Sequence, residues 1–109
     1  MAALIVLTNA PDRAVARRIA DALIERRLAA CVNLLAECTS VYRWKGAVET
    51  ATEVPLLIKT RSEMYDDVEA AIRGLHPYEL PEIIAVAVER GAPAFLDWVN
   101  TQTVTEPAE

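Results

Sequence analysis

The chain has 109 residues, of which 53% are hydrophobic and 25% are charged. This length and composition predict one globular domain and exclude an intrinsically disordered protein. Sixteen acidic residues against 11 lysines and arginines give a net charge of -5, which argues against nucleic acid as a partner because the phosphate backbone needs a positive surface.

The opening segment MAALIVLTNA is apolar, but it lacks the basic start of a signal peptide and the length of a membrane span. We therefore expect a buried strand over residues 3–9 in a cytoplasmic protein without membrane insertion. The two cysteines, Cys31 and Cys38, match no zinc or redox spacing. In a reducing compartment they are expected to be free thiols.

The next segment has the signals of an α-helix over residues 12–27. Val15, Ile19 and Leu23 repeat at helical spacing, and Pro11 suits the first turn. Arginines occupy the other faces of this helix together with acidic residues, which indicates a solvated surface rather than a binding patch.

Residues 30–58 alternate between apolar and polar positions, which predicts a β-hairpin. A two-residue turn would set apolar side chains opposite glutamates. A three-residue loop over 44–46, with Gly46 left-handed, keeps one apolar face. It pairs Tyr42 with Val48, Ala36 with Val54 and Leu34 with Leu56. Because Pro55 cannot donate to a ladder, we expect a bulge or an edge in the second arm.

The first arm of this hairpin is long for the domain. Its 14 residues, 30–43, span about 46 Å, whereas a compact domain of this size is only about 35 Å across. The hairpin is therefore expected to project beyond its own core.

Thr60 and Glu63 resemble a capping box that begins a second helix, whose apolar stripe ends near Gly74. Residues 83–88 predict another strand, and Pro93 opens a short final helix. We expect a single domain over 1–103 and a flexible tail over 104–109. The apolar stripe of the second helix comprises Met64, Val68, Ala71, Ile72 and Leu75.

The order of elements, βαββαβ with a terminal helix, predicts an α+β, ferredoxin-like sandwich with two helices on one face of an antiparallel sheet. Yet the strands at 3–9 and 83–88 are apolar at both parities, as in strands that are buried on both sides. Together with the projecting hairpin, this pattern predicts self-association.

Several segments, VLTNAPD, LAACVNLL, SVYRWKG, EVPLLIKT, HPYELPEI and FLDW, resemble the CutA divalent-cation-tolerance proteins in order from about Leu4 to Asn100. The resemblance implies a tightly packed homotrimer whose long hairpins interleave around the threefold axis. It also implies a non-enzymatic role in tolerance to copper and other divalent cations. Animal members of the family are linked to the membrane anchoring of an enzyme.

His76 is the only imidazole and therefore the first candidate ligand for copper or zinc, with Glu79 and Cys31 as weaker candidates. Copper-binding members of the family use a Cys at the end of the first strand and a His pair before Pro-Tyr. The matching positions here are Thr8 and Leu75, so only His76 remains. The resemblance thus implies weak or conditional binding of Cu(II) or another divalent cation.

An alternative assigns His76 a structural role at the end of the second helix, where Pro77 and Pro81 stiffen the turn. Trp44, near the hairpin tip, is either a platform for a ligand or an interface residue.

Lys59 lies in a strand that should be buried, where an unpaired lysine is rare. We expect Lys59, Tyr78, Glu79 and Cys31 to form an intersubunit cleft that binds a small anion or a metal. The alternative is a structural ion pair between Lys59 and Glu79.

Three other functions compete with metal tolerance. A small-ligand signalling trimer of the nitrogen-regulatory type predicts an anionic ligand near Lys59. A trimeric scaffold for another protein needs no motif. An enzyme is disfavoured, because no Ser or Cys nucleophile lies beside a His in a known motif and the chain has only three glycines.

Overall fold

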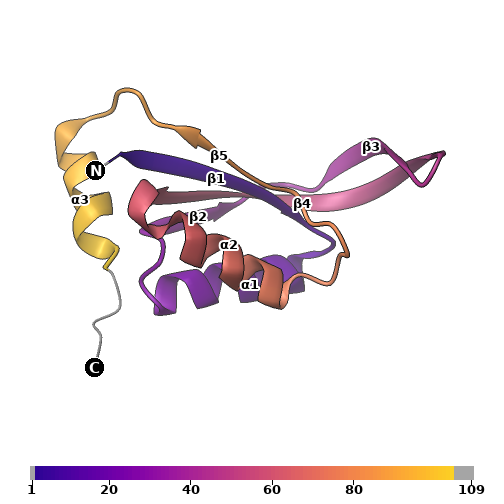
Figure 1. Ribbon diagram of the computed structural model, residues 1–109, viewed down its shortest axis with the longest axis horizontal. Coiled ribbons are helices and arrows are strands. Elements are labelled where there is room, and N and C mark those ends of the chain that lie inside the picture. Colours follow the sequence, from indigo (N-terminus) through magenta and orange to yellow (C-terminus); the bar gives the residue numbers. More distant parts are fainter. Residues whose placement is uncertain (1, 105–109) are drawn as a thin grey trace.

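A computed structural model describes residues 2–104 of the chain. The predicted ferredoxin-like α+β fold is confirmed, with an antiparallel sheet in the order β2-β4-β1-β5 and with β3 paired to the outer part of β4. Helices α1 and α2 cover one face of this sheet (Figure 1). The elements are β1 (Ala3–Ala10), α1 (Arg13–Glu25), β2 (Cys31–Leu34), β3 (Cys38–Trp44), β4 (Ala47–Arg61), the 3-10 turn η1 (Ser62–Met64), α2 (Tyr65–Leu75), β5 (Ile83–Ala87) and α3 (Pro93–Gln102).

The core lies between the sheet and the two helices. Even-numbered side chains of β1 and of the inner part of β4 point into it, because alternate residues of a strand face opposite sides. The predicted apolar faces of α1 and α2 pack against these strand side chains. The core includes Val6, Ala10, Val15, Ile19, Leu23, Val54, Leu56, Ile58, Val68 and Ile72.

Helix α1 begins at Arg13 because Asp12 is its N-cap: the Asp12 carboxylate accepts a hydrogen bond from the Val15 amide at 2.9 Å. Pro11 therefore lies outside the helix, and the prediction that it belongs to the first turn is wrong. The helix ends at Glu25, within two residues of the predicted end, and Arg27 adopts a left-handed φ of 60°.

The hairpin changes register along its length. Strand β2 pairs with β4 as predicted, with Leu34 opposite Leu56. Strand β3 is shifted by one residue, so that Tyr42 lies opposite Glu49 and Arg43 lies opposite Val48. Residues 35–37, which lie outside both strands, absorb the extra residue. The irregularity therefore lies in the first arm of the hairpin and not in the second arm, where Pro55 predicted it. The Leu35 amide in the first arm still donates to the Pro55 carbonyl at 2.9 Å.

The tip is a two-residue turn, Lys45-Gly46, with φ of 50° and 83°. The predicted three-residue loop is wrong. Beyond the core both faces of the hairpin meet solvent, and Val41 and Val48 are 67% and 63% exposed. Burial therefore no longer selects a register there, and a tight turn with two left-handed residues matches the twist of the strands.

The predicted capping box is also wrong. The Thr60 hydroxyl donates to the Leu28 carbonyl at 2.7 Å instead of capping the helix. The chain then makes the 3-10 turn η1 before α2 begins at Tyr65. Helix α2 passes through Gly74 and ends at Leu75, which is partly exposed rather than buried.

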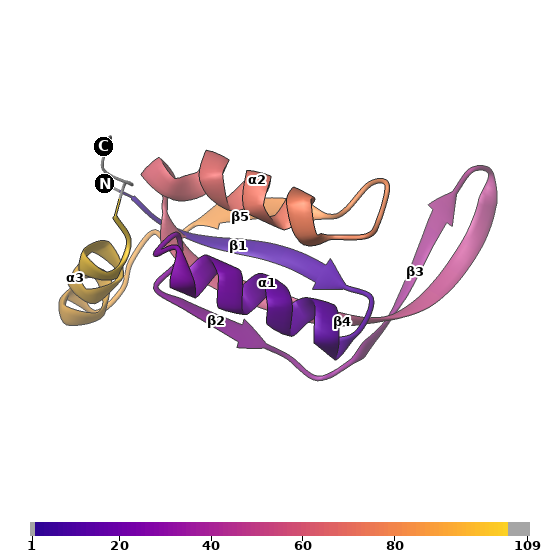
Figure 2. The same ribbon diagram turned by 90° about the horizontal axis from the view of Figure 1, so that it is seen from below.

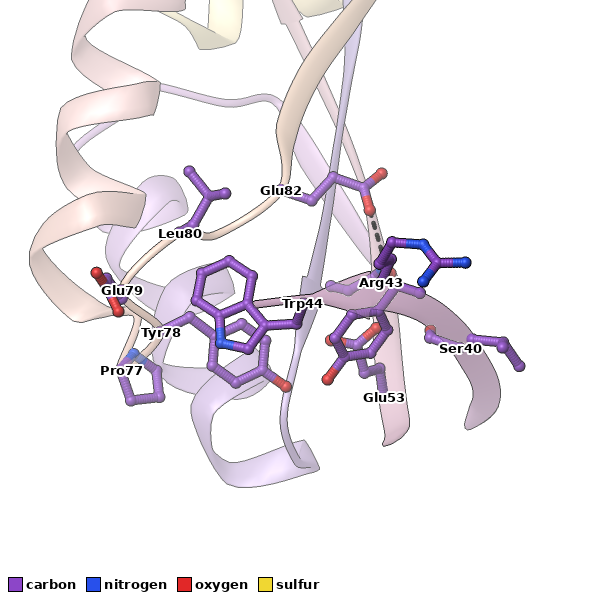
Figure 3. A pocket seen from close by; sticks show the side chains of 12 residues that line it. Ser40, Arg43, Trp44, Glu53, Pro77, Tyr78, Glu79, Leu80 and Glu82 are labelled. Atoms are coloured by element: carbon purple, nitrogen blue, oxygen red, sulfur yellow. Dashed lines mark hydrogen bonds between the residues drawn. The ribbon is translucent and has the colours of Figure 1, made fainter. Parts of the chain in front are cut away.

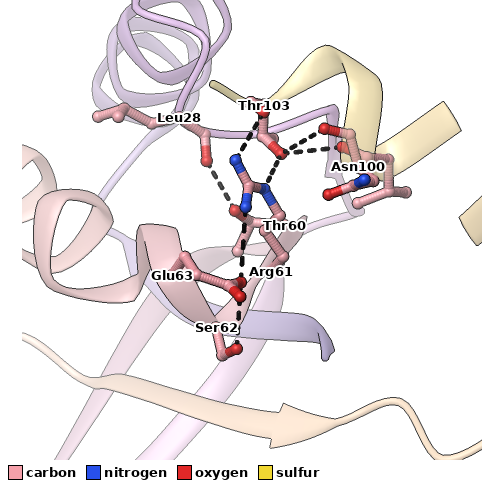
Figure 4. A network of polar contacts seen from close by, with 8 residues as sticks. Leu28, Thr60, Arg61, Ser62, Glu63, Asn100 and Thr103 are labelled. Carbon is pink, nitrogen blue, oxygen red and sulfur yellow. Dashed lines mark hydrogen bonds and ion pairs between the residues drawn. The ribbon is translucent and has the colours of Figure 1, made fainter. Parts of the chain in front are cut away.

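The Arg61 side chain attaches α3 to the end of β4 (Figure 4). Its guanidinium donates to the Thr103 hydroxyl at 2.8 Å and to the Thr103 carbonyl at 2.9 Å, and it forms an ion pair with Glu63 at 3.6 Å. The Val104 amide donates to the Arg27 carbonyl at 3.2 Å, so this first residue of the predicted flexible tail is hydrogen-bonded to the turn that follows α1. Residues 105–109 of that tail lie outside the described residues.

The outer hairpin, formed by β3 and the outer part of β4 (residues 38–53), projects well beyond the helices (Figure 2), as predicted from its length. The chain measures 44 × 34 × 22 Å. The sheet face opposite the helices, here called the open face, carries apolar side chains. Ile84 and Val86 of β5 are 51% and 48% exposed. Their cross-strand partners Leu7 and Ile5, and Leu57 of β4, lie on the same face.

One buried side-chain polar group in the core has no partner among residues 2–104. The Thr8 hydroxyl lies in the buried layer without a hydrogen bond to any described residue. An unsatisfied buried hydroxyl costs about 1–3 kcal/mol. We therefore expect Thr8→Val to raise the free energy of unfolding by about 1 kcal/mol in urea denaturation.

Thr60→Val is the matched control, because the Thr60 hydroxyl does have a partner. Its loss is expected to lower the free energy of unfolding by about 1–2 kcal/mol. Equal effects in both variants would contradict the assignment of Thr8 as unsatisfied.

Candidate functional site

His76 closes the carboxyl end of α2 and is only 7% exposed. Its Nε2 lies 2.6 Å from the Asn9 carbonyl oxygen, and its Nδ1 accepts a hydrogen bond from the Tyr78 amide at 3.2 Å. A carbonyl only accepts and a backbone amide only donates, so Nε2 carries the proton and Nδ1 does not. The imidazole thus ties the turn after α2 to the end of β1.

This arrangement does not fit a metal centre within a single chain. A ligating imidazole needs a free nitrogen lone pair, and that of Nδ1 is engaged by Tyr78. Among residues 2–104 there is no group of three or more His, Cys, Asp or Glu side chains that could hold a metal ion. The geometry favours the structural alternative for His76.

The weaker metal candidates are dispersed. Glu79 is exposed and lies 4.0 Å from the Lys45 ammonium, whereas Cys31 is on β2, paired with Lys59 of β4. Thr8 is buried within the sheet, and Leu75 ends α2. The polar partners that the His76 ring does have among the described residues are the Asn9 carbonyl and the Tyr78 amide, not any of these side chains.

The predicted cleft is divided within the subunit. The Lys59 ammonium donates to the Asn33 amide oxygen, while Tyr78 lies beside Glu53, which is six residues from Lys59 along β4 and about 20 Å away. The alternative ion pair between Lys59 and Glu79 is also absent among the described residues, since Glu79 faces Lys45. A cluster of the four residues would need side chains from two subunits.

Tyr78 and Glu79 instead line a hollow of about 800 Å³ between the outer hairpin and the turn over 77–82 (Figure 3). Trp44, predicted as a platform or an interface residue, lies on the hairpin side. The sequence interpretation missed Glu53, which is only 7% exposed, and Glu82, which accepts from the Asn9 amide at 3.2 Å. Nothing in the neighbouring sequence distinguishes Glu53 from Glu49, the exposed glutamate four residues earlier.

The Tyr78 hydroxyl is strongly affected by its surroundings. Burial, followed by hydrogen bonding with Glu53 and the negative charge of that carboxylate, raises the pKa of Tyr78 from 10.0 to about 12. Its ring packs on the imidazole of His76, with 4.5 Å between the ring centroids. His76 therefore positions Tyr78, and Tyr78 in turn contacts the buried Glu53.

Comparison with known proteins identifies the family. Residues 4–102 match the family described as CutA1 divalent ion tolerance protein. The chain belongs to the CutA1 family. It is 47% identical to the mouse protein CutA over 93 residues, which cover 85% of this chain but only 52% of the mouse protein. This CutA1-family chain thus spans about half the length of that relative.

Solved CutA structures agree with this fold. The divalent cation tolerance protein from Thermus thermophilus has a TM-score of 0.92 and 42% identity, covering 94% of this chain and 99% of that one. A CutA from Archaeoglobus fulgidus, with a TM-score of 0.89 and 39% identity over 92% of this chain and 97% of that one, is described as periplasmic.

Within residues 2–104, no helix is both long and apolar enough to cross a membrane. Because the Archaeoglobus relative is described as periplasmic, the cytoplasmic location of this CutA1-family chain stays a prediction.

The role of His76 is open to direct measurement. Long-range ¹H–¹⁵N NMR spectra are expected to show a proton on Nε2 and none on Nδ1, because of the two hydrogen bonds. His76→Ala should lower the free energy of unfolding by about 2–3 kcal/mol, because it leaves buried partners unsatisfied. Leu80→Ala in the same turn, at an exposed position, should change it by about 0.5 kcal/mol or less. A proton on Nδ1 would contradict the assignment.

The perturbed tyrosine is measurable by ultraviolet absorbance. One of the three tyrosines should titrate near pH 12 and disappear in Tyr78→Phe. Since the folded pKa is raised, the stability contributed by Tyr78 is present below about pH 10 and is lost as the pH rises toward 12. Glu53→Gln should move this titration back toward 10, whereas Glu49→Gln should not. An unchanged titration in Glu53→Gln would contradict the contact.

Proposed function

We propose that this CutA1-family protein is a non-catalytic homotrimer that acts in tolerance to divalent cations, copper among them. The observation that carries the trimer is the combination of an uncovered apolar open face and a hairpin that projects past its own core. Exposed contiguous apolar surface of this kind marks an association site. A neighbouring copy supplies the natural cover for the open face, and the projecting hairpin is long enough to reach that copy.

The absence of catalysis is supported by the only histidine. His76 has both ring nitrogens occupied by backbone groups, so it has no free nitrogen to serve as a general base. Cys31 and Cys38 are both unpaired, which suits the proposed cytoplasmic location, where thiols stay reduced.

The cation is proposed to bind to the assembly and not to one subunit. Residues 2–104 of a single copy do not gather three donor side chains, whereas three copies bring donors of different chains together. Binding to such a site is conditional on assembly, and His76 is not among its ligands.

A second candidate, binding of a small ligand, is favoured by the hollow of about 800 Å³. Pockets of about 300–1,000 Å³ are typical of small-molecule sites. This hollow is separate from the place expected for an anionic ligand, because Lys59 is not among the residues that line it.

Native mass spectrometry tests the proposal, with and without stoichiometric Cu(II). We expect a trimer that takes up copper in multiples of three, and the same uptake in His76→Gln. Val86→Asp on the open face should shift the protein toward monomer, because a buried unpaired charge costs several kcal/mol.

Ile24→Asp is the matched control, since Ile24 is equally apolar and exposed but lies on α1. It should stay trimeric. A monomeric wild type would refute the trimer, a trimer without copper uptake would refute the copper proposal, and loss of copper in His76→Gln would return His76 to the ligands.

A further inference from the structure

Glu53 is a largely buried residue whose carboxylate has no cationic partner among the described residues. It is 7% exposed, and among residues 2–104 no Lys or Arg nitrogen lies within 4.0 Å of it. A carboxylate in the wall of a hollow attracts a positive group more strongly than one in open water, because the surrounding protein lowers the local dielectric constant. The Tyr78 hydroxyl is the polar neighbour of Glu53 within the chain, and a hydroxyl carries no compensating charge. The negative charge of Glu53 is therefore available to pair with a positively charged group in the hollow.

Aromatic rings line the same hollow. Tyr42, Trp44 and Tyr78 all contribute to its wall, and the face of such a ring attracts organic cations. In Figure 3, Trp44 and Tyr78 lie on the same side of Glu53, and the Arg43 guanidinium points away from both rings. The charged residues of the lining are Arg43 and three glutamates, Glu53, Glu79 and Glu82. The net negative charge of the hollow therefore favours a cation over an anion.

The chain's own Lys45 illustrates this preference. Its ammonium lies 5.6 Å from the centroid of the Trp44 ring and 4.0 Å from a carboxylate oxygen of Glu79. An aromatic face and a carboxylate at the rim thus already hold an alkylammonium group. Lys45 is largely exposed and makes no ion pair with Glu53, so the deeper carboxylate remains available.

The hollow suits an organic cation better than a metal ion. A divalent metal needs several donors converging within about 2–2.6 Å, and the described residues include no group of three such side chains. An alkylammonium or guanidinium group needs only one carboxylate and apolar or aromatic walls. The volume of about 800 Å³ accepts a ligand of that size.

We propose that this hollow binds a small organic cation of the alkylammonium or guanidinium class, with Glu53 as the charged partner and Trp44 and Tyr78 as the aromatic walls. The inference deepens the small-ligand candidate given under the proposed function and rests on the same assembled protein. It assigns recognition of the ligand's positive charge to Glu53, a residue that the metal proposal does not use.

Tryptophan fluorescence tests the site. The chain has two tryptophans, so Trp98→Phe on α3, outside the hollow, leaves Trp44 as the only reporter. Ethylguanidinium and n-butylammonium chloride are titrated at constant chloride concentration, with 1-butanol as the neutral analogue. We expect a saturable change for both cations, with a Kd of about 1 mM or tighter, and none for butanol.

Glu53→Gln in the same background should weaken both cations at least about tenfold, because the charged partner is lost. Glu49→Gln is the matched control: it lies on the same strand, is exposed and is not part of the hollow. Its affinity should stay within about twofold of the parent.

Three outcomes would overturn the inference. The first is that the Trp44 fluorescence shows no saturable change with either cation, the second is that Glu53→Gln binds the cations as tightly as its parent does, and the third is that the fluorescence responds to Cu(II) or Zn²⁺ and to neither organic cation. Native mass spectra of the same samples separate this failure from that of the proposed function. A trimer that ignores the probes refutes only the ligand. A wild type that ignores the probes, together with a Glu53→Gln variant that dissociates, is a case of the first outcome and would point to a side chain of a second copy as the partner of Glu53.

Discussion

The backbone pairing of one strand, β4, is the constraint on which the rest of the structure depends. Its 15 residues pair with β1 and β2 over the inner part and with β3 over the outer part. Burial on one face holds the inner pairing in register. The outer part leaves the core, and its backbone pairs with β3 alone among the described strands. Glu53 lies where the strand passes from one environment to the other, and the hollow opens at that point.

The second constraint is the pair of hydrogen bonds made by His76. The bond from Nε2 connects the end of α2 to the carbonyl of Asn9 near the end of β1, 67 positions away. The same imidazole accepts from the Tyr78 amide and packs against the Tyr78 ring. The turn after α2 is thereby oriented so that Tyr78 faces Glu53. A residue type associated with metal binding has here become part of the framework that shapes the hollow.

The two proposals assign different tasks to different surfaces of one molecule. The open face is apolar and uncovered, and the hairpin projects past the core, so both suit contacts between copies. The hollow beside the hairpin is acidic and aromatic, so it suits a positively charged ligand. Family membership is compatible with both, because it establishes the fold and the relationship to divalent cation tolerance without assigning a ligand to any side chain of this chain.

The sequence by itself determined the order of elements, the buried faces of the helices and the register of β2 with β4. These depend on periodicity, which is preserved wherever one face of an element is buried. The same reasoning failed at the hairpin tip, because the apolar side chains there are exposed and burial does not select the pairing. Only the tertiary structure decided which polar side chains form the candidate site. Glu49 and Glu53 have the same parity, yet one is exposed and the other is buried against Tyr78. His76 could be identified as the only imidazole, but not as one whose two nitrogens are already engaged. These facts depend on contacts between segments far apart in the chain, and such contacts leave no local pattern in the sequence.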